Sequence, residues 1–483
     1  MVFSTLLFLF LFLPAVLLGN FILPFRFRNY FLLLSSFVFF AWGGVSYSLL
    51  LILSVLINYF VGLLIHKYRE SSGAGIALGI GVGLNLLIIV IFKYSNFIFE
   101  NINFLRSNLE YDPINIGHII LPIGISFYTF QAISYLIDLY RRQVEVQKNF
   151  ADLALYIFLF PQLIAGPIIR YHDIAAQIKT RSNNLDNFVE GIKRFVLGLA
   201  KKVLIANQMA VIADQAFNTP GDELSTLLAW LGVFAYSFQI YFDFSGYSDM
   251  AIGLGRMLGF KFPENFNFPY IARSIKEFWR RWHISLSTWF RDYLYIPLGG
   301  NRISPTRTYV NLLIVFFLTG LWHGASWNFV IWGFFHGFFL VFERLGFEKL
   351  LQRLWRPLQH IYTLFVVLIA WVFFRAETLE ASLGYLKAMF WYKPMWINIE
   401  LISEYDNLMF YLVGAAAILS SSTLWVDIQN YLSIMQTRLS RASRYIYLNM
   451  VFLIQVLAIV AVLVITTMLL VSNSYNPFIY FRF

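Results

Sequence analysis

The stretch TGLWHGASWNFVIWGFFHG, from Thr319 to Gly337, places two histidines within a run of tryptophan, phenylalanine, leucine and valine. The rest of the chain is similar: 59% of its 483 residues are hydrophobic and 13% are charged. Soluble domains carry about twice that share of charge, roughly 25%. Apolar runs of about 20 residues, the length that crosses a bilayer as a helix, recur from end to end. The sequence therefore predicts an all-α, polytopic membrane protein.

The apolar runs predict how the chain is organised. We expect roughly eleven to thirteen membrane helices, with re-entrant and interfacial helices, in one integral-membrane domain over residues 1–483. Pro161, Gly166 and Pro167 interrupt the segment LFPQLIAGPII, so it is expected to form a re-entrant element that lines a cavity and is covered by protein or water. No internal repeat is visible, which argues against a transporter. The predicted helices lie near residues 3–23, 30–43, 46–66, 74–99, 118–139, 152–170, 190–213, 225–258, 308–320, 325–345, 358–374, 406–423 and 446–471.

Charge and residue usage exclude several classes of function. The formal charge is +10, but the basic residues form short clusters between apolar runs, as the positive-inside rule requires, so no nucleic-acid partner is expected. The chain contains no cysteine, which excludes disulfides, thiolate metal sites and a cysteine nucleophile. The histidines lack ligand spacing, so no metal is expected. Arg438, Arg441 and Arg444 place the last loop in the cytoplasm and the C-terminus outside.

The segment from Tyr270 to Arg302 mixes charged residues with tryptophans. A helix over Lys276–Tyr293 would gather Phe278 and other apolar side chains on one face. One interpretation is an interfacial helix whose basic face, which includes His283, contacts membrane lipids. The other is a cavity wall that attracts an anionic cofactor and positions His283 for catalysis. The residues of the basic face are Lys276, Arg280, His283, Ser287 and Arg291.

His323 lies between Trp322 and Gly324 in the opening stretch. A histidine in hydrocarbon is costly, so such residues face a protein interior or a watered cavity. A neutral imidazole there can take a proton from a hydroxyl group, and the alternative is a packing histidine. We assign His336 a structural role. Gln239 and Asp243 share a helical face and predict a buried polar network that joins helices.

Five motifs together resemble one known family. They are similar to the membrane-bound O-acyltransferase (MBOAT) family, and in particular to its bacterial branch, which O-acetylates alginate and peptidoglycan and D-alanylates teichoic acid. The resemblance covers most of the chain. The motifs are FWRRWHISLSTWFRDYLYIPLGGNR (278–302), LTGLWHGASWNFVIWGFFHG (318–337), LPIGISFYTFQAISYLIDLYR (121–141), FPQLIAGPI (160–168) and QIYFDFSGYSDMAIGLGRMLGF (239–260).

The resemblance implies a fold and a reaction. The fold would surround a central tunnel in a bacterial inner membrane, with the family's near-invariant histidine at His323 and its second polar residue at His283. Acetyl would pass from cytoplasmic acetyl-CoA, with no permanently bound cofactor, to an extracellular polysaccharide such as alginate or peptidoglycan. The partner would be an extracytoplasmic SGNH-hydrolase-like acetyltransferase. His323 would act as base, and His283, a neighbouring arginine or a backbone donor would stabilise the oxyanion or orient the acceptor. The cationic strip, Lys276, Arg280 and Arg291, would lie near the phosphates of the donor.

The tail over residues 472–483, SNSYNPFIYFRF, ends in the pattern F-x-Y-x-x-F. This pattern resembles the acyl-transfer motif of the small partner in teichoic-acid D-alanylation, so Tyr480 is a candidate acyl relay. A tyrosyl ester is reactive because phenolate leaves readily. The alternative is an aromatic belt that anchors the last helix.

Two other functions remain open at this point. One is acylation of a lipid or protein acceptor within the membrane. The other is a transporter or polymer-export channel in which the histidines are structural.

Overall fold

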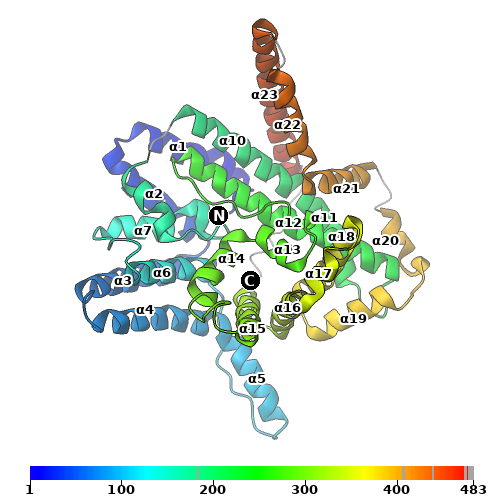
Figure 1. Ribbon diagram of the computed structural model, residues 1–483, viewed down its shortest axis with the longest axis horizontal. Coiled ribbons are helices and arrows are strands. Elements are labelled where there is room, and N and C mark those ends of the chain that lie inside the picture. Colours follow the sequence, from blue (N-terminus) through cyan, green and yellow to red (C-terminus); the bar gives the residue numbers. More distant parts are fainter. Residues whose placement is uncertain (182–183, 405–407, 438–439, 473–475, 477–483) are drawn as a thin grey trace.

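The computed structural model describes residues 1–483 except 182–183, 405–407, 438–439, 473–475 and 477–483. Every regular element in these described ranges is a helix, which confirms the all-α prediction. The long helix α12 (Thr226–Met257) lies near the centre of the molecule and is buried over most of its length (Figure 1). The other helices are arranged around it.

The first half of the chain forms one side of the body and the central helices (Figure 1). Several α-helices continue directly into a wider π-helical turn. The elements are η1 (Phe8–Phe12), α1 (Leu13–Ile22), α2 (Phe25–Ala41), α3 (Val45–Lys67), α4 (Gly73–Ile89), η2 (Val90–Tyr94), α5 (Ser95–Ser107), α6 (Ile125–Tyr140), α7 (Phe150–Phe158), α8 (Phe160–Leu163), α9 (Tyr171–Lys179), α10 (Leu185–Ala200), η3 (Lys201–Ala206), α11 (Asn207–Asn218) and α12.

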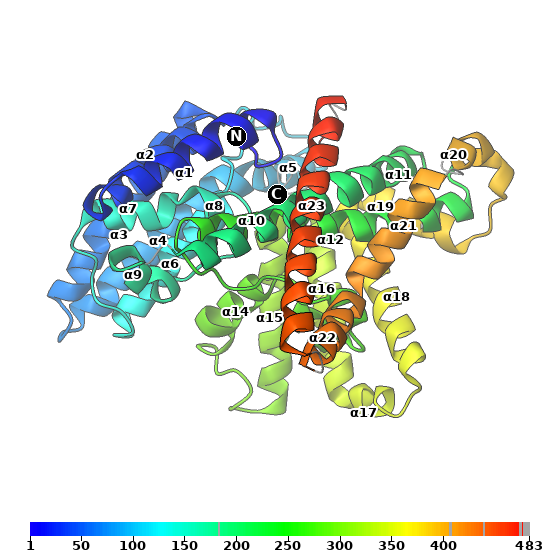
Figure 2. The same ribbon diagram turned by 90° about the horizontal axis from the view of Figure 1, so that it is seen from above.

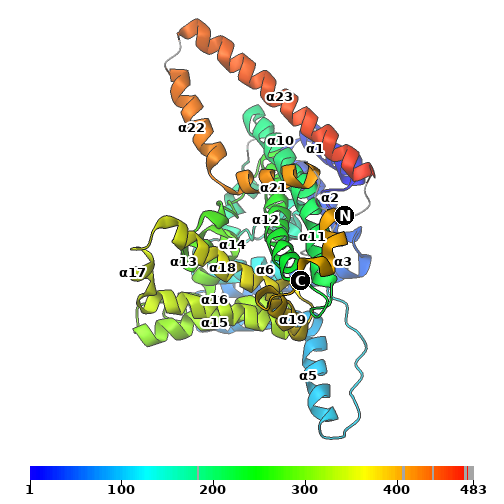
Figure 3. The ribbon, with the colours of Figure 1, turned by 90° about the vertical axis from the view of Figure 1, so that its right-hand side faces the viewer.

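The second half of the chain begins with short helices and ends in a long helix. Helices α15 and α16 lie side by side, and α22 and α23 extend beyond the body (Figure 3). The elements are η4 (Pro269–Ile271), α13 (Ile275–Arg281), α14 (Ile284–Phe290), η5 (Arg291–Tyr295), α15 (Pro305–His323), α16 (Trp327–Phe342), η6 (Glu343–Phe347), α17 (Glu348–Leu351), α18 (Arg356–Arg375), α19 (Leu379–Phe390), η7 (Met395–Asn398), α20 (Ile399–Glu404), α21 (Leu408–Ser421), α22 (Leu424–Thr437) and α23 (Arg441–Ser472).

Among the described residues, seven helices are long and apolar enough to cross a membrane, or eight if the bent pair α21 and α22 is one span. This confirms a polytopic membrane protein. The count is below the predicted number of spans because some predicted spans are shorter helices, such as α6 with 16 residues. In Figure 2 the N-terminal helices gather at one end of the body and α18 to α20 at the other.

The predicted interruption at LFPQLIAGPII is confirmed. Helix α7 ends at Phe158, and the one-turn helix α8 follows after Leu159. This segment is buried, and two of its backbone N–H groups donate hydrogen bonds to side chains of other elements. The N–H of Phe160 donates to Ser36 Oγ (3.1 Å), and that of Ile168 donates to Ser285 Oγ (2.9 Å). Protein groups therefore satisfy donors that lipid cannot.

Glycines allow α10 and α12 to touch. A Cβ atom on Gly246 would lie 2.7 Å from the carbonyl oxygen of Gly198, so only glycine fits this contact. Polar bonds lie beside it: Lys202 and Asp243 form a buried ion pair of 2.6 Å, and Lys201 bonds to Asp249 at 2.6 Å. The predicted buried network around Asp243 is confirmed.

The ion pair gives a prediction about stability. Lys202→Met leaves the Asp243 carboxyl buried without this partner, which should lower the free energy of unfolding by about 3–5 kcal/mol. The double variant Lys202→Met/Asp243→Asn should recover part of the loss because no buried charge remains. Unfolding of the detergent-purified variants measures both. A single variant as stable as the parent would contradict the prediction.

Candidate active site

The segment that carries His283 is two helices instead of one. The predicted continuous helix over Lys276–Tyr293 is wrong: α13 ends at Arg281, and α14 begins at Ile284. His283 lies between them with left-handed backbone angles, φ 44° and ψ 55°. The break has a physical cause. The N–H of Ile284 donates to the backbone oxygen of Asn265 (2.9 Å), and that of Ser285 donates to the Asn265 side chain (3.2 Å), so these donors leave the helical pattern.

The break separates His283 from the basic residues that were expected to share its face. Lys276 forms an ion pair with Glu348 (2.9 Å), and Arg291 forms one with Asp292 (2.7 Å). Arg280 is exposed at the surface, whereas His283 is fully buried. The structure therefore does not bring the strip of Lys276, Arg280 and Arg291 together with the histidine.

His283 is held by a polar network from two other segments. Its Nδ1 lies 3.1 Å from Asn265 Oδ1, which also accepts the hydroxyl of Ser285 (2.8 Å). The Nδ2 of Asn265 donates to Ser248 Oγ on α12 (3.0 Å). Because Oδ1 can only accept, Nδ1 of His283 carries the proton, and Nε2 is left as the acceptor. Within the described residues, Nε2 is buried and has no hydrogen-bond partner.

His323 is the last residue of α15 and is 2% exposed. Its ring meets the rings of Trp332 and Phe374 edge to face, at centroid distances of 5.0 and 5.1 Å. The Trp322 ring lies 4.9 Å from His323 and 5.9 Å from His283. The structure therefore brings the two predicted histidines to one aromatic ring, although they are 40 residues apart in the numbering of the chain.

His336 also lies in this aromatic cluster. It is fully buried on α16, and its Nδ1 accepts a hydrogen bond from Trp279 Nε1 (3.3 Å). Its ring lies 5.0 Å from both Trp279 and Trp332. These contacts tie α13 to α16, which is the arrangement expected of a structural histidine.

Sequence reasoning missed two polar residues of this region. Asn265 is buried and fixes the ring of His283, but nothing in the sequence of its loop distinguishes it from an asparagine at the surface. Lys93 reaches the end of α15 and is buried, with 7% exposed. It did give a signal, because a lysine inside the apolar run LIIVIFKYSNF is costly and points to a function.

A charged cluster joins α6, α9 and η5. Asp138 is fully buried; one of its oxygens bonds to His172 Nδ1 and the other accepts the Tyr293 hydroxyl, both at 2.7 Å. Arg170 forms ion pairs with Asp173 (3.0 Å) and Asp292 (2.8 Å). The hydrogen bond to Asp138, with a second one to Asp173, raises the pKa of His172 from 6.5 to about 9.

This shift predicts a pH dependence of stability. A raised pKa means that protonated His172 stabilises the fold below pH 6.5 and loses this effect as the pH rises through about 9. The melting temperature of the purified protein should therefore fall across this window. His172→Gln should start lower and show a weaker fall. Identical pH profiles for the two proteins would contradict the assignment.

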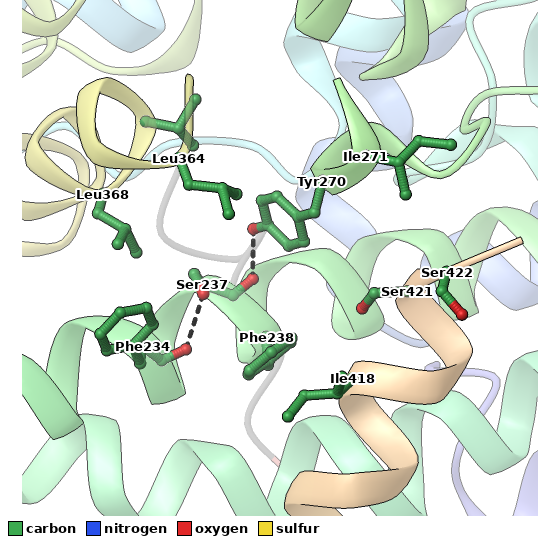
Figure 4. A pocket seen from close by; sticks show the side chains of 11 residues that line it. Phe234, Ser237, Phe238, Tyr270, Ile271, Leu364, Leu368, Ile418, Ser421 and Ser422 are labelled. Carbon is green, nitrogen blue, oxygen red and sulfur yellow. Dashed lines mark hydrogen bonds between the residues drawn. The ribbon is translucent and has the colours of Figure 1, made fainter. Parts of the chain in front are cut away.

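An apolar cavity of about 260 Å³ lies away from the histidines (Figure 4). Tyr270 points across it and donates its hydroxyl to the backbone oxygen of Ser237 (2.5 Å). Neither His283 nor His323 lines this cavity, so it is separate from the candidate site. No group of three or more histidine or acidic residues within the described ranges is arranged to hold a metal ion.

Tyr480 lies outside the described residues. The described residue nearest to it, Asn476, donates to the backbone oxygen of Ser4 (2.9 Å) and accepts from Asn207 Nδ2 (3.3 Å). Ser4 and Asn207 are buried. Asn476 therefore lies against the helical body, between the N-terminus and the start of α11.

A helical membrane body that buries two histidines around one tryptophan is suited to proton transfer away from bulk water. The chain belongs to the MBOAT, membrane-bound O-acyltransferase family, whose family model matches residues 146–379. It is thus a membrane O-acyltransferase. His283 and His323 both lie within the matched residues.

Named relatives cover most of the chain. It is 48% identical to the probable alginate O-acetylase of Pseudomonas aeruginosa, over 81% of this chain and 75% of the relative. It is 40% identical to the peptidoglycan O-acetyltransferase of Helicobacter pylori, over 80% of each protein. The teichoic acid D-alanyltransferase of Bacillus subtilis is 30% identical, over 52% of this chain and 66% of the relative.

Proposed function

We propose that this protein moves acetyl groups from cytoplasmic acetyl-CoA across a bacterial inner membrane for O-acetylation of an extracellular polysaccharide. An extracytoplasmic SGNH-hydrolase-like acetyltransferase would complete the transfer. The observation that carries the proposal is the pair His283 and His323 around Trp322, in a chain 40–48% identical to proteins named as O-acetylating enzymes. Alginate and peptidoglycan are the polymers in the names of these relatives.

His323 is the general base of the proposed reaction. The acceptor hydroxyl gives its proton to the imidazole while its oxygen attacks the thioester carbonyl; the carbon–sulfur bond then breaks, and the thiolate of CoA takes the proton back. The aromatic enclosure of His323 keeps bulk water from competing for the acyl group.

The geometry favours one of the roles that the sequence left open for His283. With its proton on Nδ1, His283 offers a lone pair at Nε2 and no hydrogen there to donate. Because the attacking hydroxyl gives its one proton to His323, His283 can accept a hydrogen bond from a different N–H or O–H group of the substrates and so orient them, whereas an oxyanion needs a donor. The donor for the oxyanion would be a backbone or arginine N–H.

Tyr480 is the proposed relay for the acetyl group. Its phenol oxygen attacks the thioester, and the resulting aryl ester is then attacked by the hydroxyl of the secreted partner, with phenolate leaving. The bonds of Asn476 support this role because they fix the tail against the body four residues before Tyr480. Four extended residues span at most about 14 Å, so the relay acts close to this anchor. The C-terminus would then be extracytoplasmic.

The binding of the donor by Lys276, Arg280 and Arg291 stays a prediction. Lys276 and Arg291 already have carboxylate partners, so phosphate groups would have to compete with Glu348 and Asp292.

Labelled acetyl-CoA added to the cytoplasmic side of inverted membrane vesicles tests the function. Label should appear on protein and then on polymer in vesicles that also contain the secreted partner, and CoA should be released in equal amount. An export channel would instead change polymer transport without consuming acetyl-CoA. If label entered only membrane lipids, the polysaccharide proposal would be wrong and lipid acylation correct.

A further inference from the structure

Helix α15 ends inside the protein, directly at the candidate base. Its last residue is His323, and the next residue, Gly324, has extended backbone angles of φ −165° and ψ 154°. The carbonyl groups of a helix's last turn have no partners within the helix. In a membrane protein, water is not available at depth to satisfy them, so other protein groups must do so.

The partners come from one wide turn of another membrane helix, η2. The Tyr94 hydroxyl donates to the backbone oxygen of Leu321 (2.6 Å). The amino group of Lys93 donates to the backbone oxygens of Trp322 and His323, the latter at 3.3 Å, and to Ser126 Oγ at 3.1 Å. π-Helical turns are frequent at functional sites, and here one directs two consecutive side chains to the same helix end.

We infer that Lys93 is a positioning residue of the acyl-transfer reaction. By bonding to the carbonyls of Trp322 and His323, it fixes the last turn of α15 and with it the direction of the His323 imidazole. It also fixes the Trp322 ring, which lies between the two histidines. This inference rests on the proposed role of His323 as the base.

The choice of residue supports a role beyond packing. A methionine would fill a similar volume in this apolar surrounding without the cost of burying an amine. The two backbone oxygens that Lys93 bonds belong to the candidate base and to the residue before it, some 230 positions later in the chain. A displacement of about 1 Å in such a group can lower a rate about 100-fold.

The test compares two substitutions of Lys93 with a matched control in the same helix. Lys93→Met removes all donors, whereas Lys93→Gln keeps an amide that can donate to a carbonyl. The control is Asn85→Leu. Asn85 on α4 is buried and exchanges two hydrogen bonds with Asn58 (2.9 and 3.1 Å), and neither residue bonds to His283 or His323 in these interactions. It measures the effect of losing buried hydrogen bonds in general.

For Lys93→Met we expect kcat to fall about 100-fold while KM for acetyl-CoA changes by less than about threefold, because donor binding does not depend on the direction of the imidazole. Lys93→Gln should recover at least about tenfold in kcat, and it carries the test if the methionine variant does not fold. Asn85→Leu should keep parent kcat per folded molecule.

Two results would overturn the inference. The first is that Lys93→Met keeps a kcat within about threefold of the parent. The second is that Asn85→Leu lowers the melting temperature as much as Lys93→Met does and also lowers kcat by the same factor. His323→Ala, measured in parallel, separates this inference from the proposed function. An inactive His323→Ala beside an active Lys93→Met overturns the role of Lys93 alone. An active His323→Ala overturns the proposed role of His323 as the base, and this inference with it, whereas the absence of acetyl transfer in the parent protein would overturn the proposed function itself.

Discussion

Replacement of His323 by alanine is expected to lower kcat for acetyl transfer by about 10²–10⁴-fold, the usual contribution of general base catalysis. The acceptor hydroxyl would then lack its proposed base and would have to attack while still carrying its proton, because the alanine side chain has no lone pair that can accept it. Release of CoA from acetyl-CoA by vesicles, divided by the amount of folded protein, measures the effect.

The control for this experiment is His336→Gln. His336 is as fully buried as His323, and both rings lie 5.0 Å from Trp332. A glutamine can still accept the indole hydrogen bond of Trp279, so this variant should keep parent activity within a few-fold. If His336→Gln lost as much activity as His323→Ala, the assignment of the base would be wrong.

Tyr480→Phe is expected to abolish acetylation of the polymer, because phenylalanine keeps the ring but has no oxygen to carry the acetyl group. In the parent protein, acetyl-CoA supplied without the secreted partner should leave one acetyl group on the tail, which mass spectrometry of the C-terminal peptide detects. Tyr475→Phe provides the matched control, since it removes a hydroxyl from the same tail outside the F-x-Y-x-x-F pattern.

The relay hypothesis is lost if Tyr480→Phe acetylates polymer at the rate of the parent. It is equally lost if Tyr475→Phe is as defective, since the effect would then belong to the tail as a whole. In either case the base function of His323 would be untouched, because another hydroxyl would give it the proton and accept the acetyl group.

Much of the fold could be predicted from the sequence because hydropathy is a local property. The helix predicted near residues 225–258 is found as Thr226–Met257, and the interruption predicted from Pro161, Gly166 and Pro167 is present after Phe158. The buried partners of Asp243 were predicted as a network because an acidic residue within an apolar helix needs one.

The helix over Lys276–Tyr293 shows why the rest could not be predicted. Its periodicity matches a single amphipathic helix, but the break at His283 depends on hydrogen bonds that Ile284 and Ser285 donate to Asn265, a residue in a preceding loop. A pattern within one segment carries no information about acceptors that another segment brings to it. The same limit hid the contact of Lys93 with α15, because Lys93 and His323 are 230 residues apart, nearly half the length of the chain.

The capping of α15 by Lys93 and Tyr94 has a consequence for biosynthesis. Both residues precede residues 146–379, the part matched by the family model, so that part alone lacks the side chains that bond to the last carbonyls of the helix carrying the candidate base. During translation, the turn that carries them enters the membrane more than two hundred residues before His323 is synthesised. The last turn of α15 therefore receives these two partners from helices made much earlier, and we expect a protein split between the two halves to be active only after the halves reassemble.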